Sequence, residues 1–268
     1  MMLDIAVLVS AGRHPVSGRP RCAPNDARAL ELALTLVHQY GGSVFVLHAG
    51  DPEQPALPGY LGMGVAELHV LPVPHGKDSL PALADTLHRR RPDMILAGVR
   101  AETGWAGGCL PYALARELDC PIVPNIDRVP MCEGGMTELH QVCPRGRRRV
   151  LRAPVPVVIT VDPAAPSPRQ SAFARARRGH IITESWFGPA IAAPDPGEPG
   201  PARRRPPRLR TATAGASAEQ RLQALTGAAE NHGRLVETDN PDEAARTILA
   251  YLAENGLIES RETDGPHK

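Results

Sequence analysis

Short apolar runs alternate with helical patterns over the first 126 residues, and this alternation constrains the fold more than any other feature. The apolar runs predict buried strands at residues 4–10, 43–50, 67–73, 93–99 and 120–126. Each run is almost continuously apolar, which is typical of parallel strands that are covered on both faces. The order of strands and helices therefore predicts an α/β fold with a doubly wound, mostly parallel sheet.

The segments between these runs carry helix start and stop signals. Asn25 or Asp26 is expected to cap the first helix, and Gly41 is expected to end it. Residues 78–90 predict the next long helix, with an Asp or a Ser as its cap, and another helical pattern begins at Leu110. These helices are long enough to cover the faces of the predicted sheet.

The chain changes character twice after residue 126. Residues 136–162 predict a β-hairpin followed by an apolar strand, which adds antiparallel strands at one edge of the sheet. The next segment is rich in Pro, Ala and Arg and shows little periodicity. The last segment has two short helical patterns, with predicted capping boxes at Ser217 and Gln220 and at Asn240 and Glu243.

These changes in composition and periodicity predict that the chain has three parts. Residues 1–162 are expected to form an α/β nucleotide-binding-like domain, and residues 163–215 an extended arm or linker. Residues 216–268 are expected to form C-terminal helices that dock on a partner subunit. An arm that ends in helices is costly to order alone, so wrapping a partner is the expected use of this part.

The stretch "GVRAETGWAGGCLPYALAREL" at residues 98–118 is the main candidate site. A strand is followed by a glycine-rich turn and then by a helix. In open α/β sheets, a nucleotide or flavin phosphate often binds at the N-terminus of such a helix. Arg100 can meet a phosphate or be a solvated charge, and Glu102 can accept ribose hydrogen bonds or cap a turn. The candidate cofactor-binding residues end the first two strands or lie in this turn: Ser10, Ala49, Gly50, Gly98, Arg100, Glu102, Thr103, Gly104, Gly107 and Gly108.

The sequence lacks the motifs of catalytic and metal sites. It contains no H-E-x-x-H, no G-x-S-x-G and no G-x-x-x-x-G-K-[ST], and no G-x-G-x-x-G follows the first strand. The five cysteines form no C-x-x-C pair, which argues against a zinc ribbon. We therefore expect no catalytic residue and no metal ligand.

Charge and hydropathy narrow the possible partners and the location. The formal net charge is +1, and few aromatic residues accompany the arginine runs, so nucleic acid is not an expected partner. No stretch approaches the ~20 apolar residues of a membrane helix, and we find no signal-peptide pattern. The expected location is the cytoplasm.

Several ordered segments resemble the beta subunit of electron-transfer flavoprotein. The family pattern N-P-F-D-E-x-A-L-E-x-A-L-x-L is similar to "APNDARALELALTL", where Pro24, Asp26 and Glu31 match. The family pattern P-D-L-I-L-x-G is similar to "PDMILAG", and "DEAARTILAYLAENGL" resembles the C-terminal pattern. The resemblance covers nearly the whole chain in order, and it implies a sheet like that of the adenine-nucleotide alpha-hydrolases.

The resemblance also implies a function, which is electron relay rather than catalysis. FAD would be held mainly by an alpha subunit, and this chain would complete the pocket and bind AMP or keep a remnant of that site. Electrons would pass from a flavin-dependent dehydrogenase, one that demethylates an amine or a betaine, to a membrane quinone oxidoreductase. By the same resemblance, Arg169, Phe173 and Arg175 would dock the dehydrogenase.

Two departures from the family pattern imply a divergent, non-bifurcating branch. The family loop D-G-D-T-x-Q-V-G-P corresponds here to "ETGWAGGCLP", and Asn25 replaces the usual Phe after N-P. Two other functions of the same fold remain open at this point. One is a nucleotide-dependent ligase or hydrolase, and the other is a stress-protein-like binding module without a redox role.

Overall fold

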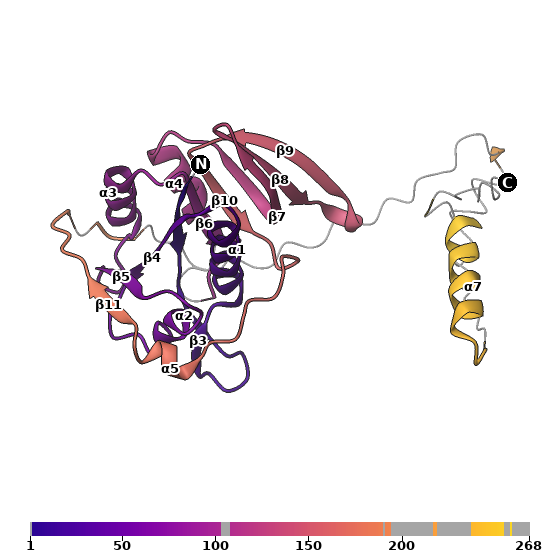
Figure 1. Cartoon of the computed structure of the whole chain (residues 1–268), viewed down its shortest axis with the longest axis horizontal. Helices are drawn as coiled ribbons and strands as arrows, with labels where there is room; N and C mark the ends of the chain where they lie inside the picture. Colours follow the sequence, from indigo (N-terminus) through magenta and orange to yellow (C-terminus); the bar gives the residue numbers. More distant parts are fainter. Residues whose placement is uncertain are drawn as a thin grey trace. The chain divides into compact units, whose positions relative to one another are not determined.

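The computed structural model describes residues 2–102, 108–189, 191–193, 217–218, 237–254 and 258. The chain divides into two compact units, Met1–Pro199 and Gly200–Lys268, and each is described by itself. Figure 1 shows the sheet and its helices in the first unit and the helix α7 in the second. The proposed division at residues 162 and 215 stays a prediction.

A nine-stranded sheet forms the centre of the first unit, in the order β11-β5-β4-β1-β6-β10-β7-β8-β9. The strands from β11 to β7 pair in parallel, whereas β7, β8 and β9 pair antiparallel at one edge. The prediction of an α/β fold with a mostly parallel sheet is therefore confirmed. The strands are β1 (Leu3–Leu8), β4 (Gly42–Gly50), β5 (Glu67–Pro72), β6 (Met94–Gly98), β7 (Ile122–Glu133), β8 (Met136–Val142), β9 (Arg148–Pro154), β10 (Val157–Val161) and β11 (His180–Thr183).

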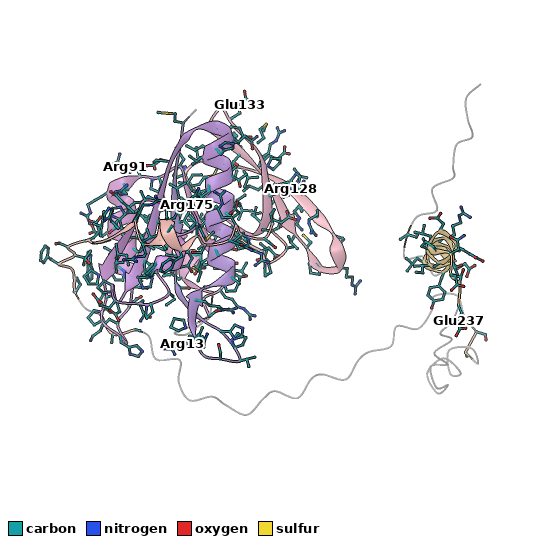
Figure 2. The ribbon with its side chains drawn as sticks, turned by 60° about the horizontal axis from the view of Figure 1, so that its bottom comes forward. Arg13, Arg91, Arg128, Glu133, Arg175 and Glu237 are labelled. Carbon is teal, nitrogen blue, oxygen red and sulfur yellow. The ribbon has the colours of Figure 1, made fainter. Side chains whose placement is uncertain are left out.

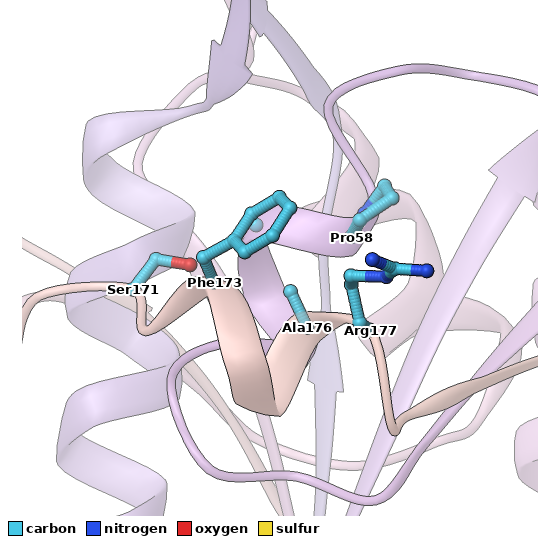
Figure 3. Close-up of a pocket in the computed structure, with 6 residues that line it drawn as sticks. Pro58, Ser171, Phe173, Ala176 and Arg177 are labelled. Atoms are coloured by element: carbon cyan, nitrogen blue, oxygen red, sulfur yellow. The ribbon is translucent and has the colours of Figure 1, made fainter.

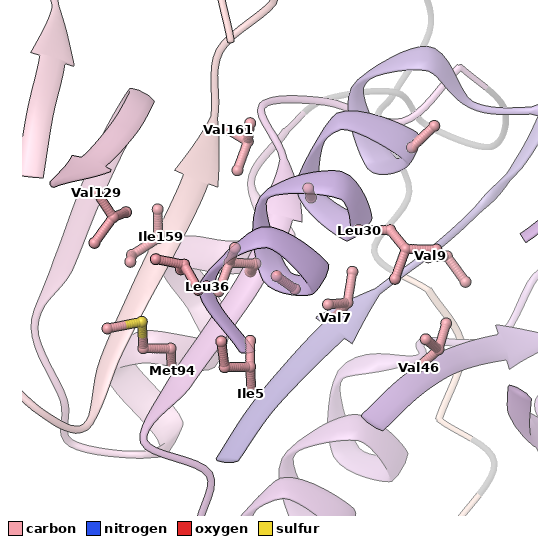
Figure 4. Packing of buried hydrophobic residues seen from close by; sticks show 14 of the residues in the cluster. Ile5, Val7, Val9, Leu30, Leu36, Val46, Met94, Val129, Ile159 and Val161 are labelled. Atoms are coloured by element: carbon pink, nitrogen blue, oxygen red, sulfur yellow. The ribbon is translucent and has the colours of Figure 1, made fainter. Parts of the chain in front are cut away.

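Helices cover both faces of the sheet, and the alternation along β1 shows how. Ile5 and Val7 belong to one buried cluster with residues of α1 (Pro24–Tyr40) and α2 (Pro58–Leu61), as Figure 4 shows for α1. Ala6 and Leu8 belong to a second cluster with α3 (Leu80–Arg90) and α4 (Leu110–Glu117). Successive residues of a strand point to opposite faces, so a run that is apolar throughout gives two covered faces.

The helix starts differ from the sequence prediction at α1. This helix begins at Pro24, a residue that suits the first helical position, and no side chain caps it. Asp26 is buried instead of capping the helix, so the prediction of an Asn25 or Asp26 cap was wrong. The prediction for the other end is confirmed, because Gly41 ends α1 with a φ of 78°. At α3, the Asp78 carboxylate accepts a hydrogen bond from the Leu80 amide at 2.9 Å.

Four described elements were not expected from the sequence. The strands β2 (Ala11–Arg13) and β3 (Pro20–Cys22) form a hairpin within the polar segment after β1. The short helix α5 (Phe173–Ala176) and the strand β11 lie within the predicted arm, and β11 pairs with β5. These elements are only three or four residues long, so their periodicity is too brief to predict them. A 3-10 turn, η1 (Pro144–Gly146), joins β8 to β9.

The helix α7 (Pro241–Glu254) is the main described element of the second unit. The Asn240 side chain accepts a hydrogen bond from the Asp242 amide at 3.0 Å, as the predicted cap requires. Glu243 accepts from the Thr238 hydroxyl instead of from the Asn240 amide, so the capping box is only half formed. The other predicted box depends on Gln220, which lies outside the described residues. No described helix combines the length and the apolar character that crossing a membrane requires.

Candidate nucleotide site

The sheet topology places a switch point between the carboxyl ends of β1 and β6, and we call the region between these two strand ends the crevice. These strands are neighbours, but the chain continues from β1 to β4 and β5 on one side and from β6 toward β10 on the other. Such a switch point is where open α/β sheets usually bind their ligands. Ser10 follows β1 and Gly98 ends β6, so two of the predicted site residues lie at this point.

Asp26 of α1 links these two strand ends through hydrogen bonds. One oxygen of its carboxylate, Oδ2, accepts hydrogen bonds from the Ser10 amide at 2.8 Å and from the Ser10 hydroxyl at 2.5 Å. The other oxygen, Oδ1, accepts from the Gly98 amide at 3.1 Å. Asp26 is only 5% exposed, and burial raises the pKa of its carboxyl to about 6, although the three hydrogen bonds oppose that rise.

Tyr60 of α2 supports Ser10 from another side. Its hydroxyl donates to the Ser10 carbonyl at 2.8 Å and accepts from the Ala23 amide at 2.8 Å. The ring is fully buried, and this burial raises the pKa of Tyr60 well above its usual range. The amide, hydroxyl and carbonyl of Ser10 are thus all engaged, which fixes the backbone where it leaves β1.

Glu102 joins the loop after β6 to the β2–β3 hairpin. Its carboxylate accepts from the Arg13 amide at 3.1 Å and pairs with the Arg21 guanidinium at 2.6 Å. Figure 2 labels Arg13 on this hairpin. The hypothesis that Glu102 accepts ribose hydrogen bonds stays a prediction, but in this structure the carboxylate holds the hairpin.

The structure describes Arg100 and Gly108 in the rest of this loop. Arg100 is exposed, as a phosphate ligand or a solvated charge requires. Gly108 has a φ of 68°, and a Cβ there would lie 2.5 Å from the Val99 carbonyl oxygen, so this position demands glycine. Thr103, Gly104 and Gly107 lie outside the described residues.

The N-terminus of α4 offers fewer donors than its sequence suggests. Pro111 has no N–H group, and the Tyr112 amide already donates to the Cys109 carbonyl at 3.1 Å. A phosphate at this end would therefore depend on the loop as well as on the helix.

The end of β4 lies beside the same crevice. His48 is buried, and its Nδ1 lies 2.8 Å from the Val9 carbonyl oxygen, so Nδ1 carries the proton. Burial lowers the pKa of His48 and keeps the ring neutral. A Cβ on Gly50 would lie 2.8 Å from its Nε2. Ala49 and Gly50 follow His48 directly, and their role in the site stays a prediction.

The predicted docking residues lie on and before α5, which packs on α2. The Ala172 amide donates to the Gly62 carbonyl at 3.0 Å, and a Cβ on Gly62 would clash with Ser171. Phe173 is 77% exposed and lines an open pocket of about 410 Å³ with Pro58 and Arg177, among others. Figure 3 shows these side chains around the pocket, and Figure 2 labels Arg175 of α5.

Arg169 has a different environment from the other two docking residues. Its guanidinium forms two hydrogen bonds with the Glu31 carboxylate of α1, at 2.8 Å and 2.9 Å, and its amide donates to the same group at 2.9 Å. The Arg169 hydrogen bond, opposed by partial burial, lowers the pKa of Glu31. Arg169 therefore anchors the segment that leads to α5.

Comparison with known proteins identifies the family to which this arrangement belongs. The model of the electron transfer flavoprotein domain matches residues 18–185, which is more than half of the chain. The chain belongs to the electron transfer flavoprotein family. A protein of Chromohalobacter salexigens named electron transfer flavoprotein subunit beta is 44% identical over 262 residues, and the alignment covers 96% of each chain.

Family membership confirms the resemblance found in the sequence. It makes this electron transfer flavoprotein chain an electron-carrier subunit rather than an enzyme, and the redox chemistry of such a subunit belongs to a flavin. The described residues contain no group of three His, Cys, Asp or Glu side chains that could hold a metal ion.

Sequence reasoning missed the two side chains that organise the crevice, Asp26 and Tyr60. A signal for Asp26 was present, because it shares a helical face with Leu30 and Ala33, both of which are buried. An acid on an apolar face needs a polar partner inside the fold. Tyr60 gave no such signal, because only the tertiary structure brings its hydroxyl to Ser10.

Proposed function

We propose that this chain pairs with an FAD-carrying alpha subunit and relays electrons from a flavin-dependent dehydrogenase to the respiratory chain. The donor is a dehydrogenase that demethylates an amine or a betaine, and the acceptor is a membrane quinone oxidoreductase in contact with the cytoplasm. The observation that carries the proposal is the family match, which runs from before α1 to the end of β11 and includes β6 and α5.

Gly98 and Gly108 support the proposed nucleotide site because they let the chain pack closely around it. A side chain at Gly98 would meet Asp26, and one at Gly108 would meet the Val99 carbonyl oxygen. In this proposal Ser10, Gly98, Arg100 and Gly108 surround the phosphate of AMP, and Thr103, Gly104 and Gly107 complete the loop. Ala49 and Gly50 lie toward the flavin, which accepts and donates the electrons when it is bound.

The α5 surface is the proposed docking site for the dehydrogenase. Phe173 is an exposed aromatic side chain on a short helix, and Arg175 and Arg177 flank it. Such aromatic residues dominate many interfaces, and the arginines can attract an acidic partner. Arg169 contributes by holding this segment to α1. The parts of the segments 163–215 and 216–268 that follow β11 are proposed to wrap and dock on the alpha subunit.

Co-expression with an alpha subunit from the same cell tests the pairing. We expect a yellow heterodimer, whereas the chain purified alone should carry no stoichiometric flavin. A single chain that is yellow with stoichiometric flavin would contradict the proposal that the alpha subunit holds the FAD. Turnover of ATP by a colourless single chain would favour the nucleotide-dependent enzyme, and neither flavin nor turnover in the mixture would favour a binding module.

A further inference from the structure

The contact between Asp26 and Ser10 has a chemical consequence beyond support of the backbone. The two oxygens, Oδ2 of Asp26 and Oγ of Ser10, are 2.5 Å apart. Only one hydrogen lies between them, and either residue can supply it, because a hydroxyl and a protonated carboxyl are both donors. Asp26 is buried, whereas Ser10 is only partly buried. Ser10 is thus the member of the pair that a ligand can reach.

The protonation site on Asp26 follows from its hydrogen-bond partners. Oδ1 faces the Gly98 amide, which is a donor and cannot accept a proton. Oδ2 also accepts from an amide, that of Ser10, but in addition it faces the Ser10 hydroxyl, which has lone pairs that can accept a hydrogen. A proton taken up from solvent therefore settles on Oδ2 and points at Ser10. The Ser10 hydroxyl hydrogen is then released from Asp26.

We propose that Asp26 is a positioning residue that sets whether Ser10 offers a donor or an acceptor to a nucleotide phosphate in the crevice. With Asp26 ionised, the Ser10 hydroxyl donates to Oδ2 and presents only lone pairs. With Asp26 protonated, the Ser10 hydroxyl hydrogen is free to donate to a phosphate oxygen. Binding of the phosphate then draws one proton from solvent onto Asp26. This inference rests on the proposed nucleotide site.

The surroundings of Asp26 favour such proton uptake. Its charged and titratable neighbours are Glu102 from the loop after β6, Cys22 at the end of β3 and Tyr60 from α2, and Glu102 raises the pKa of Asp26. Among the described residues, no arginine or lysine forms an ion pair with Asp26. Burial raises its pKa to about 6, so a small further rise on ligand binding changes its charge near neutral pH.

The first arm of the test needs no ligand. Amide NMR shifts of Ser10 and Gly98, whose N–H groups both donate to Asp26, are followed from pH 4.5 to 8 in the full chain. We expect both shifts to titrate together with a midpoint near 6, and to stay constant in Asp26→Asn. Asp127→Asn, which changes a partly buried aspartate of β7, is the matched control and should titrate as the wild type does. Shifts that do not titrate in the wild type overturn the proposal.

The second arm uses AMP and calorimetry in two buffers with different ionisation enthalpies. We expect the wild type to take up more protons on binding than Asp26→Asn or Ser10→Ala, while AMP's own titration is common to all three. Each unit by which binding raises the pKa of Asp26 makes wild-type binding about tenfold tighter at low pH than at high pH, beyond the effect of AMP's own titration, and the variants should lack this dependence. Adenosine, which lacks the phosphate, should show no difference between variants.

The two arms separate the two hypotheses. Equal proton uptake in all three proteins that bind AMP overturns the role of Asp26. If the wild type binds no AMP but the amide shifts titrate, the nucleotide site is contradicted and with it the role of Ser10 toward a phosphate, whereas the titration of Asp26 near neutral pH is confirmed. Ser10→Ala keeps the calorimetric test valid if Asp26→Asn does not fold.

Discussion

Gly98→Ala is the sharpest test of how the crevice is built. Gly98 ends β6, and its amide donates to the buried Asp26 carboxylate. An alanine Cβ at this position would lie 2.4 Å from Asp26 Oδ1 and 2.7 Å from the Asn25 Cβ. Both distances are far inside van der Waals contact, and neither neighbour is the free end of a flexible side chain. The N-terminus of α1 must therefore move away from the sheet.

The size of the effect follows from two costs. Overpacking of a buried position usually costs about 1–3 kcal/mol. Weakening the hydrogen bond from the Gly98 amide to a carboxylate adds on the order of 1 kcal/mol or more. A single movement of α1 away from the sheet relieves part of the overpacking, and the two costs are therefore not fully additive. We expect a loss of about 2–4 kcal/mol in the free energy of unfolding. For a unit of this size that corresponds to a fall in Tm of roughly 4–16 °C.

Thermal unfolding of the full chain, followed by circular dichroism at pH 7.5, measures this loss. Gly134→Ala is the matched control, because Gly134 lies in the β7–β8 turn with a φ of 59° and nothing within 4 Å of its added Cβ. The control should cost only about 1 kcal/mol, from the left-handed backbone alone. A Gly98→Ala chain as stable as the control would refute the tight contact between β6 and α1.

Four other outcomes are expected. Phe173→Ala should cost only about 0.5 kcal/mol of stability, because so little of the ring is buried. It should lower kcat/KM for reduction by the dehydrogenase roughly 30-fold, the equivalent of about 2 kcal/mol. Phe187 is 94% exposed, so Phe187→Ala is the control and should leave kcat/KM unchanged. Because the pKa of Asp26 is raised to about 6 in the fold, protonation of Asp26 stabilises the fold fully below pH 4. Up to about 3 kcal/mol of the free energy of unfolding should be lost as the pH rises through 6. Urea unfolding should show this loss in the wild type but not in Asp26→Asn. Removal of residues 200–268 should leave a folded sheet unit that no longer co-purifies with the alpha subunit in size-exclusion chromatography, and an intact complex would contradict the docking role. The heterodimer should contain one FAD, and two would mean that the loop at residues 99–109 holds a second flavin.

The parallel strands were predictable because each is an apolar run with its own boundaries. The runs at residues 4–10 and 93–99 correspond to β1 and β6 within two residues at each end. The antiparallel edge was predictable for a similar reason, since the hairpin strands are long. In contrast, β11 has four residues and owes its place to pairing with β5, a contact that the local sequence does not encode.

The backbone positions of the candidate site were predictable, but the hydrogen bonds of its side chains were not. Strand ends and glycines indicated Ser10, Gly98 and Gly108, because the local sequence largely determines backbone shape. The local sequence does not determine which side chains bond to one another. Asp26 looks like a helix cap in the sequence, and only the packing of α1 between two strand ends makes it a buried acceptor. Glu102 likewise gains its partners from a hairpin 81 residues away in the chain.

The helix α2 gives the crevice and the docking surface a common support. Tyr60 reaches from α2 to the Ser10 carbonyl, while Pro58 of the same helix lines the pocket under Phe173. Gly62, the next residue after α2, accepts the hydrogen bond that holds the start of α5. A displacement of α5 by a docking partner would therefore be transmitted to Ser10 through a helix of only four residues. Because Tyr60 is fully buried, α2 cannot move by itself without loss of packing, so a movement of α2 would carry the Ser10 carbonyl with it.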